Sequence, residues 1–392
     1  MQLPVYLDYA ASTPVDPAVA GLMDDCLRGP AGIANPAAVS HAPGRLAAQT
    51  VETARAQVAG LIGAQPAEIV FTSGATESDN LAVIGAARFR RSRGDHVITA
   101  LTEHPAVLES CRSLEREGFR VTCLAPDARG IVTPGAVAAA LTEQTVLVSL
   151  MHVNNEIGIV QDVAAVGALC RAHGALLHVD AAQSAGRLPL DVRGQCIDLL
   201  SLSAHKLGGP KGVGALFLDA ERIRRVEPLL HGGGQERGLR PGTVATHQVA
   251  GMGLACELAR QRLATDVPMI LALRERLWAR LSVIDGVLLN GDAQQRACHI
   301  LNVSVVRVEG ESLRLALRDL ALASGSACAT ESAEPSPVLR ALGRSDQLAM
   351  SSLRFSLGRQ TSEAEVDFAA DCLRAAVMRL RAMAPHADRA YA

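Results

Sequence analysis

The sequence has few aromatic residues and none of the patterns typical of membrane or secreted proteins. Its 392 residues include one Trp, three Tyr and six Phe, and the formal net charge is −2. Such a charge gives no global field that would attract nucleic acid or an anionic membrane. No apolar run approaches the roughly 18 residues that span a bilayer, and the first residues lack the basic and apolar regions of a secretory signal. We therefore expect a cytoplasmic protein with no membrane contact and no direct contact to nucleic acid.

The cysteines and glycines also lack the spacings of common ligand motifs. The nine Cys residues include no Cys-x-x-Cys pair, which argues against a zinc site and against a disulfide framework. The sequence has no Walker A motif and no G-x-G-x-x-G turn after the first strand, so a Rossmann oxidoreductase is disfavoured. We expect reduced thiols and no resident metal.

What the sequence does contain, between about residues 50 and 260, is an alternation of short apolar runs with longer helical patterns. Near-continuous apolar runs are typical of strands buried on both faces of a mostly parallel sheet. The expected strands are 68–72, 96–100, 120–124, 145–152, 175–180, 198–203 and 214–218. Helical patterns at 77–91, 106–117 and 162–173 lie between them, which indicates βαβ architecture.

The pattern changes after residue 260. A long helical stretch at 252–283 is followed by expected strands at 287–289 and 300–305 and by expected helices at 310–320 and 363–383. We expect a large domain over residues 14–260 and a smaller α+β domain formed by residues 1–13 and 261–392.

Two charged residues stand at the ends of expected strands. Lys206 lies in the run Ser-Ala-His-Lys-Leu-Gly-Gly after the strand 198–203, and Asp180 ends the run Leu-Leu-His-Val-Asp. In isolation each has an ordinary alternative, a surface lysine or a helix cap. Together they match pyridoxal phosphate, which takes a lysine for its aldehyde and a carboxylate for its pyridinium nitrogen. Ligands of α/β sheets also bind at such strand ends.

The run Thr-Ser-Gly-Ala-Thr-Glu at 72–77 follows an expected strand and opens a helix. Its small residues leave backbone N–H groups free at a helix N-terminus, where a phosphate can bind. An ordinary helix cap at Ser73 or Thr76 is the alternative. The glycine-rich basic loop at 231–243 could close over a phosphate, or it could be a connection on the protein surface.

Four further residues each have a functional and an ordinary interpretation. His104 can stack on a flat ring and relay protons, or face solvent in a loop. Asn155 can donate to a ring oxygen or serve in a turn. Cys328, in a stretch of small residues, can attack a substrate as a thiolate or be exposed by chance. Arg354, within an apolar segment, suits a substrate carboxylate or a structural salt bridge.

Taken together, these motifs resemble the cysteine desulfurases of the iron–sulfur cluster assembly and nitrogen-fixation type. That family lies within the class V aminotransferase-like, fold type I pyridoxal phosphate enzymes. The matching segments extend over nearly the whole chain and include residues 71–80, 178–180, 205–206 and 324–328. The combination is specific, although the single motifs are not. The resemblance implies a fold type I transferase, with a mostly parallel seven-stranded sheet in a large domain and a smaller α+β domain.

The resemblance also implies a role for each matching residue. Lys206 would hold pyridoxal phosphate through a Schiff base, Asp180 would pair with the pyridinium nitrogen, and His104 would stack on the ring and act in catalysis. The other cofactor contacts would come from Ala75, Thr76, Asn155, Gln183, Ser203 and His205, and from Thr243 of the partner subunit. Arg354, with Asn155, would bind the carboxylate of L-cysteine. Cys328 would take the sulfur as a persulfide and release alanine.

The family further implies a homodimer that passes sulfur to an iron–sulfur scaffold protein and to other acceptors, including those that serve transfer RNA thiolation. Cys328 would then also be a transient iron–sulfur ligand on the scaffold. A selenocysteine lyase or an aminotransferase of the same fold is the alternative among enzymes. A non-catalytic sulfur-carrier platform is the alternative outside enzymes, and Lys206 and Asp180 argue against it.

Overall fold

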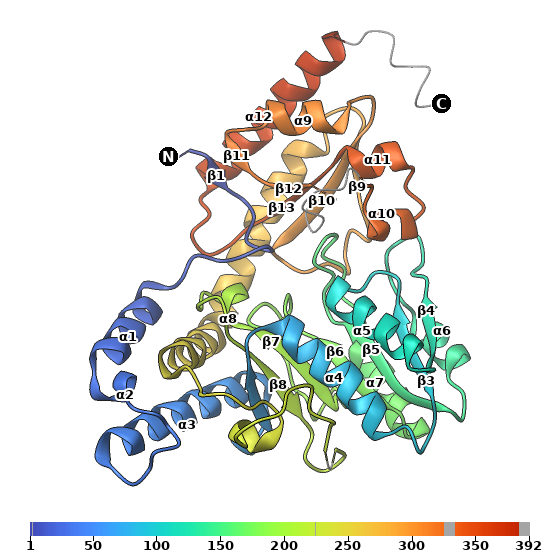
Figure 1. Ribbon diagram of the computed structural model, residues 1–392. Helices are drawn as coiled ribbons and strands as arrows, with labels where there is room; N and C mark the ends of the chain where they lie inside the picture. The colour runs from blue at the N-terminus through green and yellow to red at the C-terminus, as the bar shows by residue number, and fades with distance from the viewer. Residues whose placement is uncertain (2, 224, 325–333, 384–392) are drawn as a thin grey trace.

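A seven-stranded sheet forms the centre of the N-terminal part of the molecule (Figure 1). The computed structural model describes the chain except residues 2, 224, 325–333 and 384–392. In spatial order the strands are β2 (Ile69–Thr72), β8 (Gly214–Leu218), β7 (Leu199–Ser203), β6 (Leu176–Asp180), β5 (Thr145–Met151), β3 (His96–Ala100) and β4 (Arg120–Leu124). β8 alone runs in the opposite direction to the other six. The expected mostly parallel α/β fold and its seven strands are confirmed.

Helices cover both faces of this sheet. The elements are α1 (Pro17–Arg28), α2 (Pro30–Ile33), α3 (Ala42–Ile62), α4 (Ala75–Phe89), α5 (Pro105–Arg116), α6 (Pro134–Ala140) and α7 (Val163–His173), with 3-10 turns η1 (Pro66–Glu68), η2 (Ala204–Lys206) and η3 (Gln235–Gly238). One apolar core includes Ile69 and Phe71 of β2 together with α3 and α7, and another includes Val70 together with α4 and α5. Successive strand residues thus face opposite layers, as the alternation of side chains along a strand requires.

A second, four-stranded antiparallel sheet lies in the C-terminal part. Its order is β12 (Ala323–Ser324), β13 (Ser352–Ser356), β10 (Ile300–Val305) and β9 (Val287–Leu289). The accompanying helices are α9 (Gly310–Ala316), α10 (Pro337–Ala341), α11 (Asp346–Met350) and α12 (Glu363–Met383). Helix α8 (Thr246–Leu281) contributes to the core of the first sheet and to that of the second (Figure 1). The division of the chain near residue 260 falls inside this helix and stays a prediction.

Two segments differ from the expectation. The helix expected at 310–320 ends at Ala316, because Leu320 pairs with Val5 in a small parallel sheet of β1 (Val5–Tyr6) and β11 (Leu320–Ala321). The long helix expected from residue 252 already begins at Thr246, because Val249 and Ala250 extend its buried face. The β1–β11 pairing ties the N-terminal segment to the C-terminal part of the chain. In the part of the chain that the structure describes, no helix has the length and apolar character needed to cross a bilayer.

Candidate active site

The carboxyl ends of the parallel strands border a cavity of about 540 Å³. Met151 ends β5, Asp180 ends β6 and Ser203 ends β7, and all three line the cavity. Open α/β sheets bind ligands at this edge. The sequence-predicted residues that line it are Ala75, Thr76, His104, Asn155, Asp180, Gln183, Ser203, His205, Lys206 and Arg354. The structure therefore brings most of the predicted site together.

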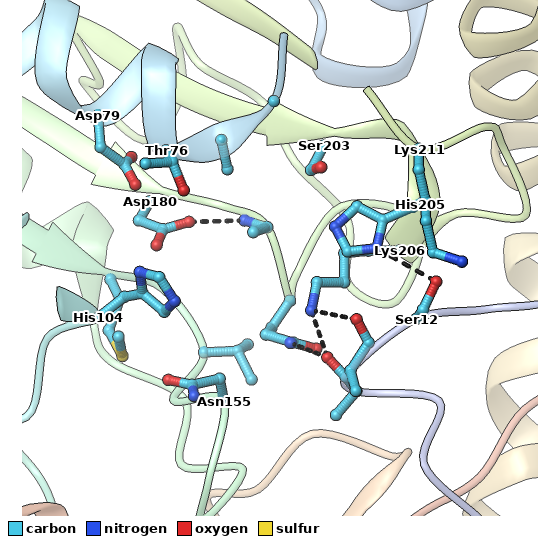
Figure 2. Close-up of a pocket in the computed structure, with 18 of the residues that line it drawn as sticks. Ser12, Thr76, Asp79, His104, Asn155, Asp180, Ser203, His205, Lys206 and Lys211 are labelled. Atoms are coloured by element: carbon cyan, nitrogen blue, oxygen red, sulfur yellow. Dashed lines mark hydrogen bonds between the residues drawn. The ribbon is translucent and has the colours of Figure 1, made fainter. Parts of the chain in front are cut away.

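Lys206 reaches the cavity from the 3-10 turn η2, which follows β7. The chain can turn away directly afterwards because Gly208 adopts a φ of 82°. The ammonium group donates hydrogen bonds to the carbonyl oxygens of Ala10 and Ala11, the latter at 2.9 Å. Asp180 lies on the opposite side of the cavity (Figure 2). The amine and the carboxyl group are thus separated by the space that a planar ligand would occupy.

Asp180 is one of three buried carboxyl groups in this region. Burial raises the pKa of Asp180, while neighbouring His104 and Lys206 act in the opposite direction. Burial and the adjacent Asp180 raise the pKa of Asp79 on α4 well above its usual range. Burial likewise raises the pKa of Glu103 well above its usual range. Burial thus disfavours a charge on Asp79 and Glu103, whereas Asp180, which has His104 and Lys206 as neighbours, is the carboxyl group best placed to carry a negative charge opposite a ring nitrogen.

His104 is the N-cap residue of α5, and this position fixes its ring. Its Nδ1 accepts a hydrogen bond from the Ala106 backbone N–H at 3.1 Å, so the proton of the neutral ring lies on Nε2. Burial lowers the pKa of His104, whereas the neighbouring Asp180 raises it. The ring lies beside Asp180 at the cavity wall (Figure 2). A neutral imidazole held there can stack on a planar cofactor and exchange a proton through Nε2.

The turn between β2 and α4 offers backbone amides to an anion. Helix α4 begins at Ala75, and Gly74 before it provides no side-chain cap. Ser203, His205 and Lys211 line the same cavity. Burial and two neighbouring lysines lower the pKa of His205 to about 4, so its ring is neutral near pH 7. The helix N-terminus and the Lys211 ammonium group, not the imidazole, would supply positive potential to a phosphate.

Gln183 lies at the cavity wall with its side-chain amide already engaged. Its Nε2 donates to the Ala10 carbonyl oxygen at 2.8 Å, and its Oε1 lies 3.2 Å from His299 Nε2. Burial lowers the pKa of His299 well below its usual value, so a neutral ring donates this bond. Asn155 lies in the lower part of the cavity as drawn in Figure 2. Both predicted partners of a ring oxygen are therefore present, and Gln183 is fixed in orientation.

Arg354 projects from β13 to the edge of the cavity, where protein groups hold it. Its Nη1 donates to the Asn155 carbonyl oxygen and its Nη2 to Asp8 Oδ1, each at 2.8 Å. The side chain is 6% exposed, and its Nε has no hydrogen-bond partner among the described residues. The structural salt bridge considered from the sequence is thus present. A substrate carboxylate would bind this guanidinium by sharing it with Asp8 or by displacing Asp8.

Two predicted residues are not brought to this cavity. Thr243 lines a separate cavity of about 200 Å³ together with Glu236 and Arg240. Its predicted contact with the site of the partner subunit stays a prediction. Cys328 lies outside the described residues, and its predicted role stays a prediction as well. Within the described ranges, no group of three or more His, Cys, Asp or Glu side chains is arranged to hold a metal ion.

The structure adds cavity residues to which the sequence analysis gave no role. They include Asp8, Ser12, Glu77, Asp79 and Lys211. Asp79 carries the clearest signal, because it lies on α4 directly before a nearly all-apolar stretch in which most residues are buried. An acidic residue in such a place needs a polar neighbour. Asp8 and Ser12 carry no comparable signal, because only the pairing of β1 with β11 brings their segment to the site.

The fold and the cavity together define a class of protein. The chain belongs to the aminotransferase class-V family, whose model matches residues 5–368. Proteins of this family use pyridoxal phosphate. The cavity fits this cofactor, because it combines the Lys206 amine, the buried Asp180 and a turn with open amides at Ala75.

Individual relatives are similar over their full length. A protein from Shewanella woodyi named cysteine desulfurase IscS is 55% identical over 98% of this chain and 95% of its own. One of the same name from Vibrio atlanticus is 56% identical over the same shares. A solved structure described as a NifS-like protein has a TM-score of 0.89 at 33% identity and covers 96% of this chain and 100% of its own. Another, described as SspA in complex with cysteine, has a TM-score of 0.78 at 36% identity, over 91% of this chain and 100% of its own.

Proposed function

We propose that this chain is a pyridoxal phosphate-dependent cysteine desulfurase. It converts L-cysteine to L-alanine and passes the sulfur on as a persulfide of Cys328. The observation that carries the proposal is the placement of Lys206, Asp180 and Arg354 around one cavity. Family membership supports the cofactor, and the full-length likeness to proteins named cysteine desulfurase supports the reaction.

Different residues around the cavity would contact different parts of the cofactor. Lys206 would hold the aldehyde carbon of pyridoxal phosphate, Asp180 would pair with its ring nitrogen, and His104 would stack on its ring. The remaining contacts would come from Ala75, Thr76, Ser203 and His205 at the phosphate and from Asn155 and Gln183 at the ring oxygen. When bound, pyridoxal phosphate supplies the electron sink that weakens the Cβ–S bond of the substrate.

The chain itself supplies orientation and proton transfer. Arg354 fixes the substrate carboxylate through charge-assisted hydrogen bonds, and Asn155 lies beside it. His104 lies next to Asp180 and holds a proton on Nε2. This nitrogen can donate the proton to the substrate and take it back during the reaction. The Lys206 amine lies against the carbonyl oxygens of Ala10 and Ala11, which keep it at the cavity wall.

Cys328 takes the sulfur. Its thiolate attacks the substrate sulfur, the Cβ–S bond breaks, and its electron pair with a proton completes the methyl group of alanine. L-cysteine and one thiol thus give L-alanine and one persulfide, so that atoms and electrons balance. A reductant or an acceptor thiol then removes the outer sulfur and restores Cys328.

Partners follow from the relatives. We infer a homodimer in which Thr243 reaches the phosphate of the partner's site, and an iron–sulfur scaffold protein as one acceptor of the sulfur. Proteins named IscS support the supply of sulfur for cluster assembly. Cytoplasmic location and a transient cluster contact through Cys328 belong to the same proposal.

Alanine release from L-cysteine by purified protein with added reductant tests the proposal. Turnover that is lost in Cys328→Ala, with the visible absorbance of the cofactor retained, is the expected result. An aminotransferase would keep its activity in Cys328→Ala, and a selenocysteine lyase would prefer the selenium substrate. A protein that takes up no pyridoxal phosphate would support the non-catalytic sulfur carrier instead.

A further inference from the structure

A carboxylate lines the cavity at the turn to which the proposed function assigns the phosphate of the cofactor. Glu77 lies in the first turn of α4 and lines the cavity together with Ser73, Ala75 and Thr76. Its Oε2 accepts a hydrogen bond from the Ser73 backbone N–H at 2.7 Å. The carboxylate therefore lies directly against the turn between β2 and α4. A negative charge in this place opposes the binding of an anion.

The Glu77 carboxylate is ionised at neutral pH. Burial by itself would raise its pKa, but hydrogen bonds from Arg240 and Ser73 lower the pKa below its usual value. The side chain is 19% exposed, so water and salt screen its charge only in part. A phosphate that binds at the same turn is therefore repelled by Glu77 unless another group neutralises this carboxylate.

Arg240 supplies the opposite charge. Its Nε donates to Glu77 Oε1 at 2.9 Å, and its Nη2 donates to Glu77 Oε2 at 3.5 Å. Arg240 belongs to the glycine-rich loop 231–243 and is not among the described residues that line the cavity, whereas Glu77 is. Its effect on a ligand in the cavity is therefore exerted through the charge of Glu77.

The loop has other contacts that maintain its shape. The Gly242 backbone N–H donates to Gln235 Oε1 at 3.0 Å. Glu236 forms a buried ion pair with Arg55 of α3 at 2.8 Å. Removal of the Arg240 guanidinium therefore changes the charge at the turn more than the structure of the loop.

We propose that Arg240 is a positioning residue for the phosphate of pyridoxal phosphate, because it neutralises Glu77 and so allows the turn between β2 and α4 to accept an anion. This inference rests on the proposed function, which makes that turn the phosphate site. It also assigns a role to the glycine-rich loop, for which the sequence left open a cover over a phosphate or a connection on the surface. The loop acts on the phosphate by the charge of one side chain.

A comparison of two ligands measures what the phosphate contributes. Full-length protein is dialysed to equilibrium at pH 8 against graded concentrations of pyridoxal phosphate or of pyridoxal, which lacks the phosphate. The visible absorbance of the Schiff base gives each Kd, and the Kd of pyridoxal is divided by that of pyridoxal phosphate. Structural damage to the site weakens the binding of both ligands and leaves this ratio unchanged. A change of charge at the phosphate turn alters the ratio.

Arg240→Met should lower the ratio about tenfold, the order expected for like charges a few ångströms apart in a water-like dielectric. Arg240→Lys keeps the positive charge and should leave the ratio within about threefold of wild type. Adding Glu77→Gln to Arg240→Met should restore the ratio to the same range. The glutamine amide oxygen can still accept from Ser73 and carries no charge.

Arg88→Met is the matched control. Arg88 lies in the last turn of α4, at the opposite end of the helix from Glu77. It pairs with Glu117 at 2.7 Å, and these side chains are 32% and 31% exposed. Loss of this pair should leave the ratio unchanged, because the pair is remote from the phosphate turn.

An unchanged ratio in Arg240→Met would overturn the proposal, even if both ligands bind more weakly, because that result indicates a structural role. An equal loss in Arg240→Lys, or a loss that Glu77→Gln does not restore, would overturn it as well. In each of these cases the wild type still binds pyridoxal phosphate, and the proposed function stands. A wild type that takes up no pyridoxal phosphate would contradict the proposed function itself, and the role of Arg240 with it.

Discussion

The buried ion pair between Arg55 and Glu236 gives a quantitative test of the fold around the cavity. Arg55 on α3 donates from Nη1 and Nη2 to the two carboxylate oxygens of Glu236 at 2.8 and 2.9 Å. The two side chains are 7% and 3% exposed. Glu236 Oε2 also accepts the Phe71 backbone N–H at 2.8 Å. The pair thus fixes the 235–238 turn to β2, the strand that leads into the anion-binding turn.

Replacing Arg55 by Met leaves Glu236 buried without its counter-charge. Breaking a buried pair in this way costs roughly 3–5 kcal/mol. At about 2.1 cal/mol/K per residue, a chain of 392 residues has an unfolding entropy of roughly 0.8 kcal/mol/K. Arg55→Met should therefore lower Tm by about 4–6 °C.

Arg276→Met is the matched control. Arg276 pairs with Asp367 at 2.7 Å, but these side chains are 43% and 30% exposed. Exposed pairs contribute about 0.2–1 kcal/mol, so Tm should fall by about 1 °C or less. Calorimetric scans of both holoenzymes at one scan rate give the comparison. Adding Glu236→Gln to Arg55→Met should restore part of the loss, because the Gln can still accept from Phe71 and carries no charge.

The reasoning is wrong if Arg55→Met and Arg276→Met shift Tm equally. It is also wrong if the double variant is less stable than Arg55→Met. Either result would mean that the buried pair contributes no more than an exposed one, and that the 235–238 turn is held by other contacts.

Two further predictions concern the substrate and pH. Arg354→Met should raise KM for L-cysteine about 10- to 100-fold with kcat little changed, the loss of one charged contact, and a change in kcat alone would contradict the assignment. Burial lowers the pKa of His152 to about 4, below the unfolded value of about 6.5. Above pH 6.5 His152 is neutral in both the folded and the unfolded chain, so it does not change the free energy of unfolding. As the pH falls toward 4, the unfolded chain binds a proton at His152 before the folded chain does, and the free energy of unfolding decreases. Wild type should therefore lose roughly 3 kcal/mol more than His152→Asn between pH 7 and 4, and parallel Tm curves for the two proteins would refute this.

The sequence predicted the parts of the fold that depend on local pattern. Six of the seven central strands are short, mostly apolar and buried, so their composition identifies them, whereas the edge strand β4 is partly exposed. Lys206 and Asp180 were found because each stands at the end of such a strand. Helix α3 is not among the helices that were predicted from the sequence. Its 21 residues are fixed by packing against α8.

What the sequence could not predict are contacts that depend on two distant segments. Asp79 faces Asp180 only because α4 lies over β6 and β7, and no spacing along the chain connects the two acids. The link between Arg354 and Asp8 joins residues from opposite ends of the chain. Whether Arg354 was a substrate contact or a salt bridge therefore had no answer in the pattern of residues around it.

The N-terminal segment supplies the acceptors for two cationic groups of the cavity. The Ala10 and Ala11 carbonyl oxygens accept from Lys206, and Asp8 accepts from Arg354. The same Ala10 oxygen also accepts from Gln183. A buried cation without a partner would be costly, so these acceptors stabilise Lys206 and Arg354 at the cavity.

Asp8 and a bound carboxylate would compete for the Arg354 guanidinium. A carboxylate that reaches Arg354 replaces one carboxylate by another, so the net affinity reflects the difference between two ion pairs and not the full strength of one. Asp8→Asn would remove the negative charge that competes for Arg354 but would keep a side chain of the same shape. In the proposed function, Asp8 of the N-terminal segment therefore competes with the substrate carboxylate for Arg354, although the two residues lie far apart in the sequence.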